Sequence, residues 1–499
     1  MAEAEENACI PILRALSDES RWRIVRLLAG RESSLTLGEI ADALELSVYN
    51  ASRHVKNLHE VGVVTIRRDG RFKHVGIAEH YRGSIQSAAA GSGDLDLGCC
   101  RFDFSREPGE RPPFSNFQLR ENATISTLSP MSSSPARYIM IGGFLGAGKT
   151  TAVAAVARHL SEKGHRVGLI TNDQGRELVD TAMLRSRGFA TEEIAGGCFC
   201  CRFNSLVDAA GKLTEEAKPD VFIAEPVGSC TDLVATVTYP LRRIYGEQFT
   251  VAPLSVLVDP MRARRILGLE EGRSFSEKVT YIYCKQLEEA DVIVISKRDL
   301  IDDATEEELR AALEERFPGT RVLAISAREG VGMDEWFEII ESEDQVARPA
   351  MKIDYDIYAE GEALLGWLNA TIEVTAEDEV DAGPLLKAIA QIIQNRLNGK
   401  SAEVAHLKMT LSPDNAFAGE VAIVNLVRND YKPELCQELD EPITSGQIIL
   451  NLRAECDPDD LAKIVADAVS SASSKACRLT LEHLENFRPG RPVPTHRDA

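Results

Sequence analysis

One short stretch, from Tyr138 to Thr151, constrains the fold of this chain more than any other. Tyr138–Ile141 is short and apolar, as a buried strand would be. Gly143–Thr150 follows and fits G-x-x-x-x-G-K-[ST], the phosphate-binding P-loop. The helical run Thr151–Leu160 comes next. A strand, a glycine-rich turn and a helix in this order predict an α/β domain that binds a nucleotide. The simpler alternative is a glycine-rich turn with a chance lysine.

Each residue type in this loop suits a role in phosphate binding. Glycines let the backbone turn tightly, so that successive N–H groups face phosphate oxygens, and the positive end of the next helix attracts the anion. Lys149 is expected to reach the β- and γ-phosphates, and the Thr150 hydroxyl is expected to bind Mg²⁺. The expected phosphate contacts are Gly143, Gly146, Ala147, Gly148, Lys149, Thr150 and Thr151.

The totals indicate a multidomain globular protein. A length of 499 residues predicts about three or four domains, and 44% hydrophobic with 27% charged residues is an ordinary composition. No apolar run approaches membrane-helix length and the N-terminus is acidic, so we expect a cytoplasmic protein without a membrane partner. Eleven cysteines in that reducing compartment indicate metal or redox chemistry before disulfides. The net charge of −22 argues against non-specific nucleic-acid binding by the whole chain, but is compatible with one basic domain.

Residues 8–83 read as a compact helical unit that ends in a hairpin. Apolar residues at helical spacing predict helices at Ile10–Leu16, Arg21–Leu28, Thr36–Leu44 and Val48–Val61. Two strands follow around an Asp69-Gly70 turn. From Ser47 to Arg82, basic residues outnumber acidic ones, against the trend of the chain.

This order resembles the winged helix-turn-helix of the ArsR-type (arsenic-repressor) family. The resemblance rests on the segments Leu16–Leu28, Ser52–Leu58 and Gly62–Arg71. It implies double-stranded DNA as a partner, with the helix after Ser47 in the major groove and the hairpin against phosphates, and we expect a homodimer. The expected DNA contacts are Tyr49, Asn50, Ser52, Arg53, Lys56, Arg67, Arg68 and Arg71. The alternative is a helical domain that only dimerises.

The metal-sensing cysteines that many relatives carry before the recognition helix are missing here. Cys99 and Cys100 lie after the hairpin instead, where they are either half of a soft-metal site or two small residues of a buried strand. They belong to a segment, residues 84–136, whose second part is rich in Ser, Pro, Arg and Glu and reads as a flexible linker.

Residues 137–345 alternate strands and helices, which predicts a mainly parallel α/β sheet. The expected strands are Tyr138–Ile141, Val167–Thr171, Val221–Ala224, Ala252–Val258, Val292–Ser296 and Arg321–Ile325. Ligands bind at the carboxyl ends of such strands, so motifs at those ends deserve weight.

Four motifs follow these strands in order. Asp173 and Glu225 are expected in the Mg²⁺ shell and, with Lys149 and Thr150, in catalysis, while Gly228 can offer its N–H to the γ-phosphate. Asp299 can accept hydrogen bonds from guanine, and Ser326 can support the base. The expected contacts at the guanine end of the site are Ser296, Lys297, Asp299 and Ser326. Together these motifs favour GTP over ATP.

Between the second and third strands lies Gly196-Gly-Cys198-Phe-Cys200-Cys201. Three thiols in four residues, in a reducing compartment, indicate a soft-metal site for an ion such as Zn²⁺, Co²⁺ or Ni²⁺. A fourth ligand must come from elsewhere: water, Cys230 or a partner. The alternative is three small buried residues at a strand end.

The P-loop, Glu225-Pro-Val-Gly228 and the Cys-x-Cys-Cys motif, in this order, resemble the CobW-type GTPases, relatives of nickel-insertion GTPases. The resemblance implies a metallochaperone that holds metal on its cysteines and passes it to a client under control of GTP. Two positions depart from the family: Ser296 stands where Asn is usual, and Pro226 stiffens a loop that is Glu-Thr-Ser-Gly-like in relatives.

Residues 351–485 read as a third folded unit of α+β type, similar to the C-terminal domains of CobW-type proteins. The strands expected there are Trp367–Val374, Val404–Leu411, Glu420–Val427, Gln447–Ala454 and Arg478–His483, and the helices are Pro384–Leu397 and Pro458–Ser474. The tail, residues 486–499, is expected to be an extended, solvated end.

The sequence therefore predicts a GTP-hydrolysing metallochaperone with a DNA-binding domain that links it to metal-responsive transcription. Two alternatives stay open. One is a transcriptional regulator that senses metal and GTP; the other is a maturation factor for a corrinoid enzyme.

Overall fold

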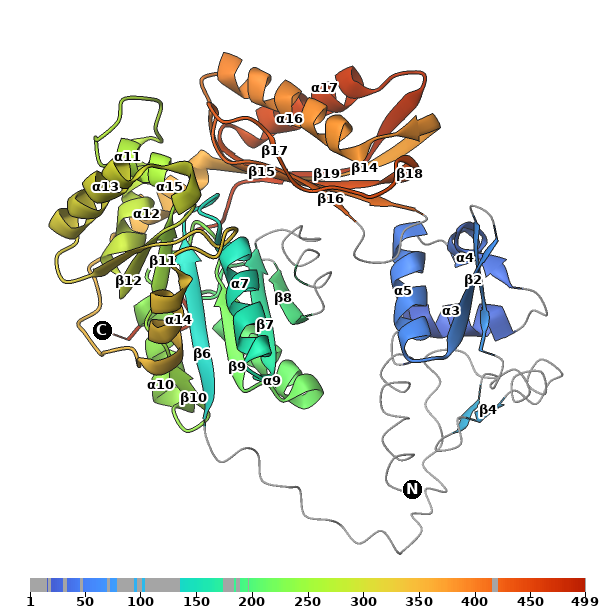
Figure 1. Cartoon of the computed structure of the whole chain (residues 1–499), viewed down its shortest axis with the longest axis horizontal. Helices are drawn as coiled ribbons and strands as arrows, with labels where there is room; N and C mark the ends of the chain where they lie inside the picture. Colours follow the sequence, from blue (N-terminus) through green and yellow to red (C-terminus); the bar gives the residue numbers. More distant parts are fainter. Residues whose placement is uncertain are drawn as a thin grey trace, which may run out of the picture. The chain divides into compact units, whose positions relative to one another are not determined.

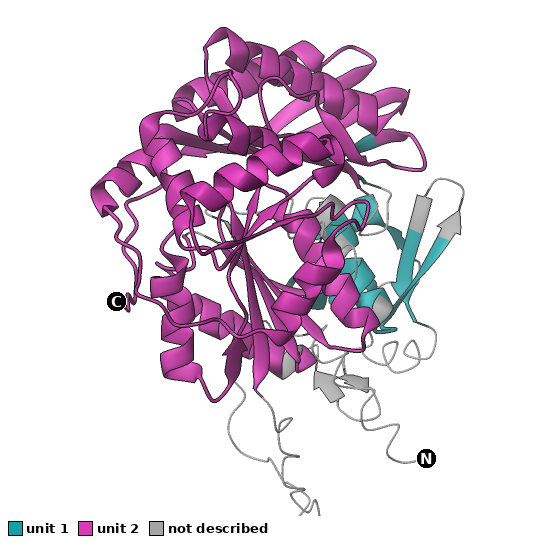
Figure 2. Cartoon of the chain, turned by 60° about the vertical axis from the view of Figure 1, so that its left-hand side comes forward, with its two compact units in different colours: residues 1–131, 412–420, 445–447 teal, residues 132–411, 421–444, 448–499 magenta. Residues whose placement is uncertain are grey.

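The structure is a computed structural model, and it describes residues 16, 19–29, 34–44, 48–69, 72–78, 94–96, 101–103, 135–173, 184, 189–195, 197–414 and 421–498. The chain divides into two compact units, each treated by itself below (Figure 2). One contains Met1–Met131 with Ser412–Glu420 and Ser445–Gln447, and the other contains the rest. Among the described residues, no helix is both long enough and apolar enough to cross a bilayer.

The first unit is a helix-turn-helix with a β-hairpin. Its main elements are α3 (Glu19–Ala29), β1 (Leu35–Thr36), α4 (Leu37–Leu44), α5 (Val48–Glu60), β2 (Val64–Asp69) and β3 (Phe72–Ile77). The sheet order is β1-β3-β2, and two short strands, β4 (Asp94–Asp96) and β5 (Arg101–Asp103), pair separately. At the start of α4 the Glu39 carboxylate accepts from the Thr36 N–H (2.8 Å) while the Thr36 hydroxyl accepts from the Glu39 N–H (3.3 Å), which is a capping box.

The predicted helices and hairpin of this unit are confirmed from α3 to β3. Ile24, Ile40, Val55 and Leu58 are fully buried and form its core. The helix expected at Ile10–Leu16 falls outside the described residues except for Leu16. Cys99, Cys100 and the linker up to residue 134 also lie outside them.

The second unit is built on an eight-stranded sheet in which neighbouring strands run parallel. Its order is β13-β12-β11-β6-β9-β7-β8, with β10 also paired to β6. The strands are β6 (Ala136–Gly143), β7 (Val167–Asp173), β8 (Ala190–Ala195), β9 (Val221–Glu225), β10 (Phe249–Val251), β11 (Ser255–Val258), β12 (Val292–Ile295) and β13 (Arg321–Ala324). The predicted parallel α/β sheet is thus confirmed.

Strands β8 and β10 are absent from the predicted set. β8 contains Thr-Glu-Glu and β10 is only three residues long, so neither has an apolar run that indicates a strand. The strand expected over Ala252–Val258 was wrong in its first half: the chain leaves β10 after Val251 and re-enters the sheet only at Ser255. β6 is central and buried, because it pairs with β9 on one side and with β10 and β11 on the other.

Helices cover both faces of this sheet (Figure 1). They are α7 (Lys149–Glu162), α9 (Phe203–Ala217), α10 (Tyr239–Tyr245), α11 (Pro260–Ile266), α12 (Glu277–Glu288), α13 (Asp303–Arg316) and α14 (Met333–Ser342). Two apolar clusters result: α7 and α14 pack on the face that carries Ile139 and Ile141, and α9 and α12 pack on the face that carries Tyr138 and Met140. This alternation along β6 is what a strand buried on both faces requires.

The C-terminal part of the same unit is a six-stranded sheet of order β17-β16-β15-β18-β14-β19. Its elements are α15 (Tyr355–Leu364), β14 (Leu365–Val380), α16 (Ala382–Gly399), β15 (Glu403–Pro413), β16 (Ala422–Leu426), β17 (Glu434–Gln437), β18 (Ile443–Glu455), α17 (Pro458–Ala472) and β19 (Cys477–Phe487). The five predicted strands and two predicted helices are present; α15 and β17 were not foreseen.

The two faces of this second sheet have different neighbours. α16 and α17 lie on one face and bury Leu407, Met409 and Leu452 beneath them (Figure 1). Trp367, on β14, points the other way and joins the apolar cluster of the parallel sheet. Because side chains alternate along a strand, the residues next to Leu407, His406 and Lys408, are turned toward the P-loop side.

Candidate nucleotide and metal site

The P-loop has the backbone that its glycines predict. Gly143, Gly146 and Gly148 have φ values of +129°, +79° and +88°, which L-residues rarely adopt. A Cβ on Gly143 would collide with the backbone of Leu257. Gly148 caps α7, so the first N–H groups of that helix face the loop. Lys149 is buried, with 7% of its surface exposed, and its ammonium lies 3.5 Å from the Phe144 carbonyl inside the loop.

Two predicted Mg²⁺ ligands meet beside this loop. The Thr150 hydroxyl donates to Glu225 Oε1 (3.0 Å), which brings the start of α7 to the end of β9. Both groups are buried hard oxygen donors, so they fit Mg²⁺. The backbone of Asp173 ends β7 and pairs with Ala195, but its side chain lies outside the described residues.

A cavity of about 300 Å³ opens over the P-loop, and the C-terminal sheet supplies one of its walls. From the parallel sheet it is lined by Gly146, Lys149, Thr150, Asn172, Glu225 and Gly228, among others. Trp367, His406, Lys408 and Asn425 line it from the C-terminal sheet. Lys408 Nζ lies 3.4 Å from the Thr150 hydroxyl. The site is therefore shared between two domains of one compact unit, which the sequence did not predict.

The ring of His406 is buried near lysine and arginine side chains. Its pKa is held well below the ordinary range, first because the ring is buried and then because Lys408, Arg453, Lys149 and Arg262 repel a second positive charge. His406 is therefore neutral at physiological pH, and the positive charge near the P-loop resides on the lysines and arginines.

The loops after β12 and β13 meet at the far end of this cavity. The Arg298 N–H donates to the Ile325 carbonyl (2.9 Å), which joins the Ser296–Asp299 and Ser326–Arg328 segments. Lys297, Ala327 and Arg328 line the cavity. Asp299 is exposed, and Ser326 is buried with its hydroxyl accepting from the Glu329 N–H (3.2 Å).

Ser296, placed in sequence at the position where Asn is usual, holds the P-loop from behind. Its buried hydroxyl lies 2.7 Å from the Ala147 carbonyl and 2.9 Å from that of Val258. Lys297 has φ +52° and donates to the Gly146 carbonyl (2.8 Å) and to Asp259 (2.8 Å). A contact of Ser296 or Asp299 with guanine stays a prediction.

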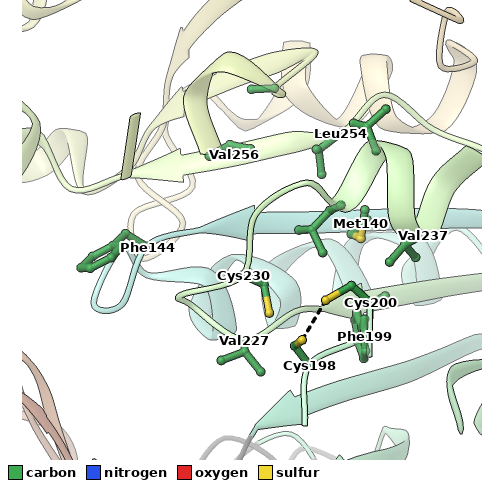
Figure 3. Close-up of a cluster of buried hydrophobic side chains, with 14 of the residues drawn as sticks. Met140, Phe144, Cys198, Phe199, Cys200, Val227, Cys230, Val237, Leu254 and Val256 are labelled. Atoms are coloured by element: carbon green, nitrogen blue, oxygen red, sulfur yellow. Dashed lines mark hydrogen bonds between the residues drawn. The ribbon is translucent and has the colours of Figure 1, made fainter. Parts of the chain in front are cut away.

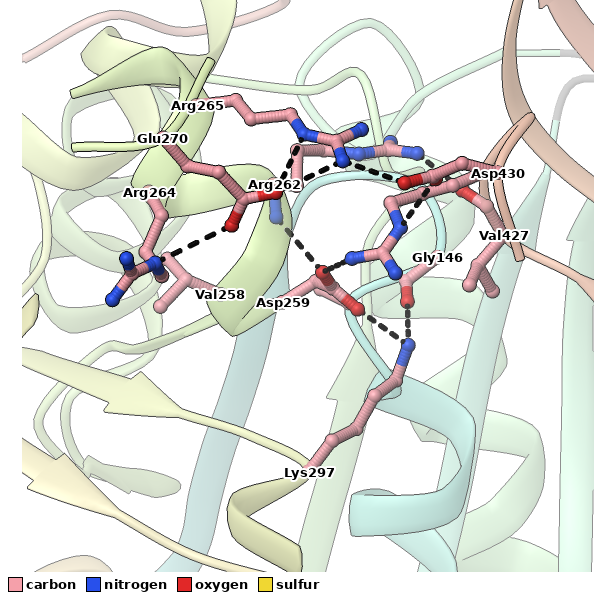
Figure 4. Close-up of polar contacts among 12 residues, drawn as sticks. Gly146, Val258, Asp259, Arg262, Arg264, Arg265, Glu270, Lys297, Val427 and Asp430 are labelled. Carbon is pink, nitrogen blue, oxygen red and sulfur yellow. Dashed lines mark hydrogen bonds and ion pairs between the residues drawn. The ribbon is translucent and has the colours of Figure 1, made fainter. Parts of the chain in front are cut away.

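A buried network ties the P-loop to the C-terminal sheet (Figure 4). Arg262 donates to the carbonyls of Leu145 (3.0 Å), Val404 (3.1 Å) and Val427. Asp259 caps α11. One of its carboxylate oxygens accepts from Lys297 and the other accepts from Arg428 (3.3 Å). Burial alone raises the pKa of Asp259, but the nearby cations outweigh it and hold that pKa far below the ordinary range.

The three cysteines of the Cys-x-Cys-Cys motif converge after β8. The Sγ–Sγ distances are 2.8 Å between Cys198 and Cys200, 3.3 Å between Cys198 and Cys201, and 3.7 Å between Cys200 and Cys201. Among the residues that the structure describes, this is the one group of three or more His, Cys, Asp or Glu donors compact enough to hold a metal ion. Cys198 and Cys200 are buried and Cys201 is half-buried, so the group opens to solvent on one side.

A fourth sulfur lies beside this group (Figure 3). Cys230, in the loop after β9, is buried and lies next to Cys198 and Cys200 (Figure 3). Hydrogen bonds from Cys200, Cys201 and Cys230 hold the pKa of Cys198 well below its usual range, while the contact with Cys198 raises that of Cys201 to about 11. One thiolate is therefore already favoured without metal, and thiolate is the ligand form of cysteine.

The tail covers the open side of the cysteine group, so the expectation of a solvated end was wrong. The Val493 N–H donates to Cys201 Sγ (3.2 Å), and the Thr495 N–H donates to the Cys200 carbonyl (2.8 Å). Arg497 pairs with the buried Asp232 (2.7 Å). Alternating prolines keep the segment extended, as predicted, but sequence alone did not indicate where it binds.

Two short connections run from the nucleotide cavity to the cysteines. Gly228 lines the cavity and packs so closely on the P-loop that a Cβ there would lie 2.9 Å from the Leu145 nitrogen; Cys230 follows two residues later. Asn172 also lines the cavity and donates to the carbonyls of Ile194 (2.9 Å) and Gly197 (2.6 Å), directly before Cys198. Asn172 was not predicted as a site residue, although it precedes Asp173 in a motif that was.

The predicted DNA contacts lie on the expected elements of the first unit. Ser52 and Lys56 are half-buried on α5, and Arg67 is exposed on β2. α5 also carries Tyr49, Asn50 and Arg53, and β2 carries Arg68, but the side chains of these four lie outside the described residues, as does Arg71.

Comparisons with known proteins match both units. Residues 137–323 match the family model for the CobW/HypB/UreG nucleotide-binding domain, and residues 16–67 match a helix-turn-helix domain model. The zinc chaperone YeiR of Escherichia coli (strain K12) is 30% identical over 178 residues, which are 35% of this chain and 50% of YeiR. The zinc chaperone CobW of Sinorhizobium is 33% identical over 185 residues, 33% of this chain and 51% of that protein. The chain thus spans about half the length of these two relatives.

The N-terminal region has a relative of its own. YceK of Bacillus subtilis (strain 168), described as an uncharacterized HTH-type transcriptional regulator, is 35% identical over 79 residues. These are 16% of this chain and 79% of YceK.

Proposed function

The chain carries a nucleotide-binding domain of the CobW/HypB/UreG family behind an N-terminal helix-turn-helix domain, and from this premise we propose that it is a GTP-hydrolysing metallochaperone. The observation that carries the proposal is the pairing of two sites in one sheet. A P-loop with Thr150 and Glu225 in contact lies one loop away from three converging thiols. Its cargo is a transition ion of the Zn²⁺, Co²⁺ or Ni²⁺ class, for which thiolates are suitable ligands.

The residues of the P-loop and of the loops beside it suggest how GTP is held and cleaved. The P-loop N–H groups and Lys149 bind the β- and γ-phosphates, and Lys149 stabilises charge that develops as water attacks the γ-phosphate. Thr150 and Glu225, with Asp173, would hold Mg²⁺. Mg²⁺, when bound, neutralises charge on the β- and γ-phosphates. Gly228 offers its N–H to the γ-phosphate, and Lys297, Asp299 and Ser326 hold the base.

The three thiols suggest how metal is held between capture and delivery. Cys198 and Cys200 are buried, while Cys201 faces the side where the tail lies, so transfer to a client protein proceeds through Cys201. Zinc is the cargo named for YeiR and for the Sinorhizobium relative, which favours zinc among the candidate ions.

The decisive test measures both activities on one preparation. Full-length protein purified without chelator should contain about one transition ion per chain and should hydrolyse GTP faster than ATP. Cys200→Ala should lose the ion and keep nucleotide binding, whereas Lys149→Ala should lose hydrolysis and keep the ion. If the wild-type protein retains no ion and cleaves no GTP, the proposal is wrong.

A second function, transcriptional regulation, is favoured by the helix-turn-helix domain and by its similarity to YceK. On this proposal the domain binds DNA as a homodimer through α5 and the β2–β3 hairpin, and metal or GTP in the second unit alters that binding. Footprinting on upstream DNA of the protein's own operon, with and without Zn²⁺ and GTP, tests it. Arg67→Ala should weaken any footprint, and a complete lack of protection under all four conditions would leave only the chaperone.

A further inference from the structure

The structure offers a candidate for the ligand that three cysteines alone cannot supply. Zinc in a closed protein site takes four ligands, and the Cys-x-Cys-Cys motif provides three. Cys230 comes from a different loop, between β9 and α10, with 1% of its surface exposed. Its sulfur lies on the same side as the sulfurs of Cys198 and Cys200 (Figure 3).

The sulfurs of the Cys-x-Cys-Cys motif are already close to the spacing of a metal site. With zinc–sulfur bonds of about 2.3 Å, the sulfurs of a tetrahedral site lie about 3.8 Å apart. The three measured separations are 2.8, 3.3 and 3.7 Å. Binding an ion therefore requires these three cysteines to move apart by only about 1 Å or less. Cys230 lies outside the group of sulfurs that are all within 4.8 Å of one another, so its sulfur has to move inward by about 1 Å or more to complete the site.

Hydrogen bonds on both sides of Cys230 hold together the loop that carries it. Gln286 donates to the carbonyls of Gly228 (2.9 Å) and Cys230 (2.8 Å). The Ser229 hydroxyl donates to the buried Glu362 (2.7 Å), and Thr231 is bound by Glu289 (3.0 Å). A small apolar residue filling a gap would not need this fixation, whereas a ligand must be held in place by neighbours that do not themselves bind the metal.

We propose that Cys230 is the fourth thiolate ligand of the metal bound by Cys198, Cys200 and Cys201, and that through it the nucleotide acts on the metal. This inference rests on the proposed function, which places a soft ion on the three cysteines. It adds the missing ligand and the physical connection between the two sites.

The connection follows from the position of Gly228. Gly228 lines the nucleotide cavity, lies directly against Leu145 of the P-loop, and is followed two residues later by Cys230. Gln286 binds the carbonyls of both Gly228 and Cys230, so this loop moves as one piece and a shift of Gly228 toward a γ-phosphate also displaces Cys230. Metal bound by four thiolates resists that shift, so GTP and metal change each other's affinity by the same factor.

Cobalt titration of the full-length reduced protein tests this inference, because the charge-transfer absorbance of Co²⁺ grows with the number of thiolate ligands. Compared with wild type, Cys230→Ala should lose roughly a quarter of the band and bind Co²⁺ roughly a hundredfold more weakly. Cys230→Ser, which keeps the side-chain volume, should behave alike. Cys284→Ala is the matched control, because Cys284 lies on α12 outside the thiol group, and it should match wild type. Binding of a fluorescent GTP analogue shows that each variant is folded.

The same titration with a non-hydrolysable GTP analogue tests the connection. Wild type should show a nucleotide-dependent change in Co²⁺ affinity, and Cys230→Ala should show none. If Cys230→Ala and Cys230→Ser keep the full band and the nucleotide effect while Cys200→Ala loses the band, the inference is wrong and the proposed function stands. If wild type itself shows no thiolate band, the proposed function fails.

Discussion

Lys408 Nζ lies 3.4 Å from the hydroxyl oxygen of Thr150, although 258 positions separate the two residues. Thr150 begins α7 at the P-loop, and Lys408 belongs to β15 of the C-terminal sheet. The C-terminal domain therefore places a cation where the phosphates and Mg²⁺ of a bound nucleotide are expected. This gives that domain a role in the nucleotide site that its lack of sequence motifs did not suggest.

We predict that Lys408 contributes to GTP hydrolysis as a charge supplied from within the chain. A hydrogen bond to a charged group contributes about 1.5–3 kcal/mol, so Lys408→Ala should lower kcat/KM for GTP about tenfold or more. Lys408→Arg, which keeps the charge, should recover most of the activity. The control is Lys387→Ala, on the exposed side of α16. An unchanged kcat/KM in Lys408→Ala, or equal losses in the arginine variant, would contradict a role for the charge.

Arg262 should be critical for stability. It is fully buried and donates to carbonyls of the P-loop and of β15, including Leu145 (3.0 Å) and Val404 (3.1 Å). Arg262→Met leaves these carbonyls and the charge of Asp259 without that partner, so the free energy of unfolding should fall by about 3–5 kcal/mol. Urea unfolding followed by tryptophan fluorescence measures it.

The matched control for that variant is Arg264→Met on the same helix. Arg264 pairs with Glu308 (2.6 Å) and Glu270 (3.4 Å), which are both partly exposed, and such pairs contribute about 1 kcal/mol or less each. Similar losses in the two variants would show that the buried network is not what joins the domains.

Sequence reasoning succeeded where a local pattern determines local structure. The P-loop required glycine at positions 143, 146 and 148, and all three have positive φ values. The three thiols of the Cys-x-Cys-Cys motif converge because only four residues contain them. In both cases the spacing along the chain fixes the spacing in space.

It failed where contacts depend on how distant segments pack. The alternation in β15 shows that His406 and Lys408 share a face, but it does not show that this face covers the P-loop. Cys230 was one of three options for a fourth ligand, because no spacing rule links it to Cys198. The tail reads as a solvated end, since its partners, Cys200, Cys201 and Asp232, lie more than 250 positions away.

The tail should control access to the thiols. Thr495 contacts the carbonyls of Cys200 through its N–H (2.8 Å) and of Cys201 through its hydroxyl (3.2 Å). Thr495→Pro removes both donors, and two hydrogen bonds of about 1 kcal/mol each predict that alkylation of Cys201 by iodoacetamide becomes roughly thirtyfold faster. Val493→Ala is the control, because the Val493 side chain is 69% exposed and its N–H is retained. Equal alkylation rates in wild type and Thr495→Pro would show that the tail does not shield the site.

Glu289 should make the stability of the second unit depend on pH. Burial raises its pKa from 4.5 to about 8, although Thr231 and Val234 donate hydrogen bonds to it. The folded state thus binds the proton more tightly than the unfolded state does, and this stabilisation is complete below the unfolded pKa and is lost as pH rises through about 8.

Glu289→Gln keeps the shape of the side chain and cannot lose a proton. As pH rises from about 5 to about 9, the urea midpoint of wild type should therefore fall relative to that of Glu289→Gln. Glu288→Gln, at the exposed neighbouring position, should keep the wild-type pH dependence. Parallel pH profiles for wild type and Glu289→Gln would show that Glu289 is already ionised in the folded protein at neutral pH.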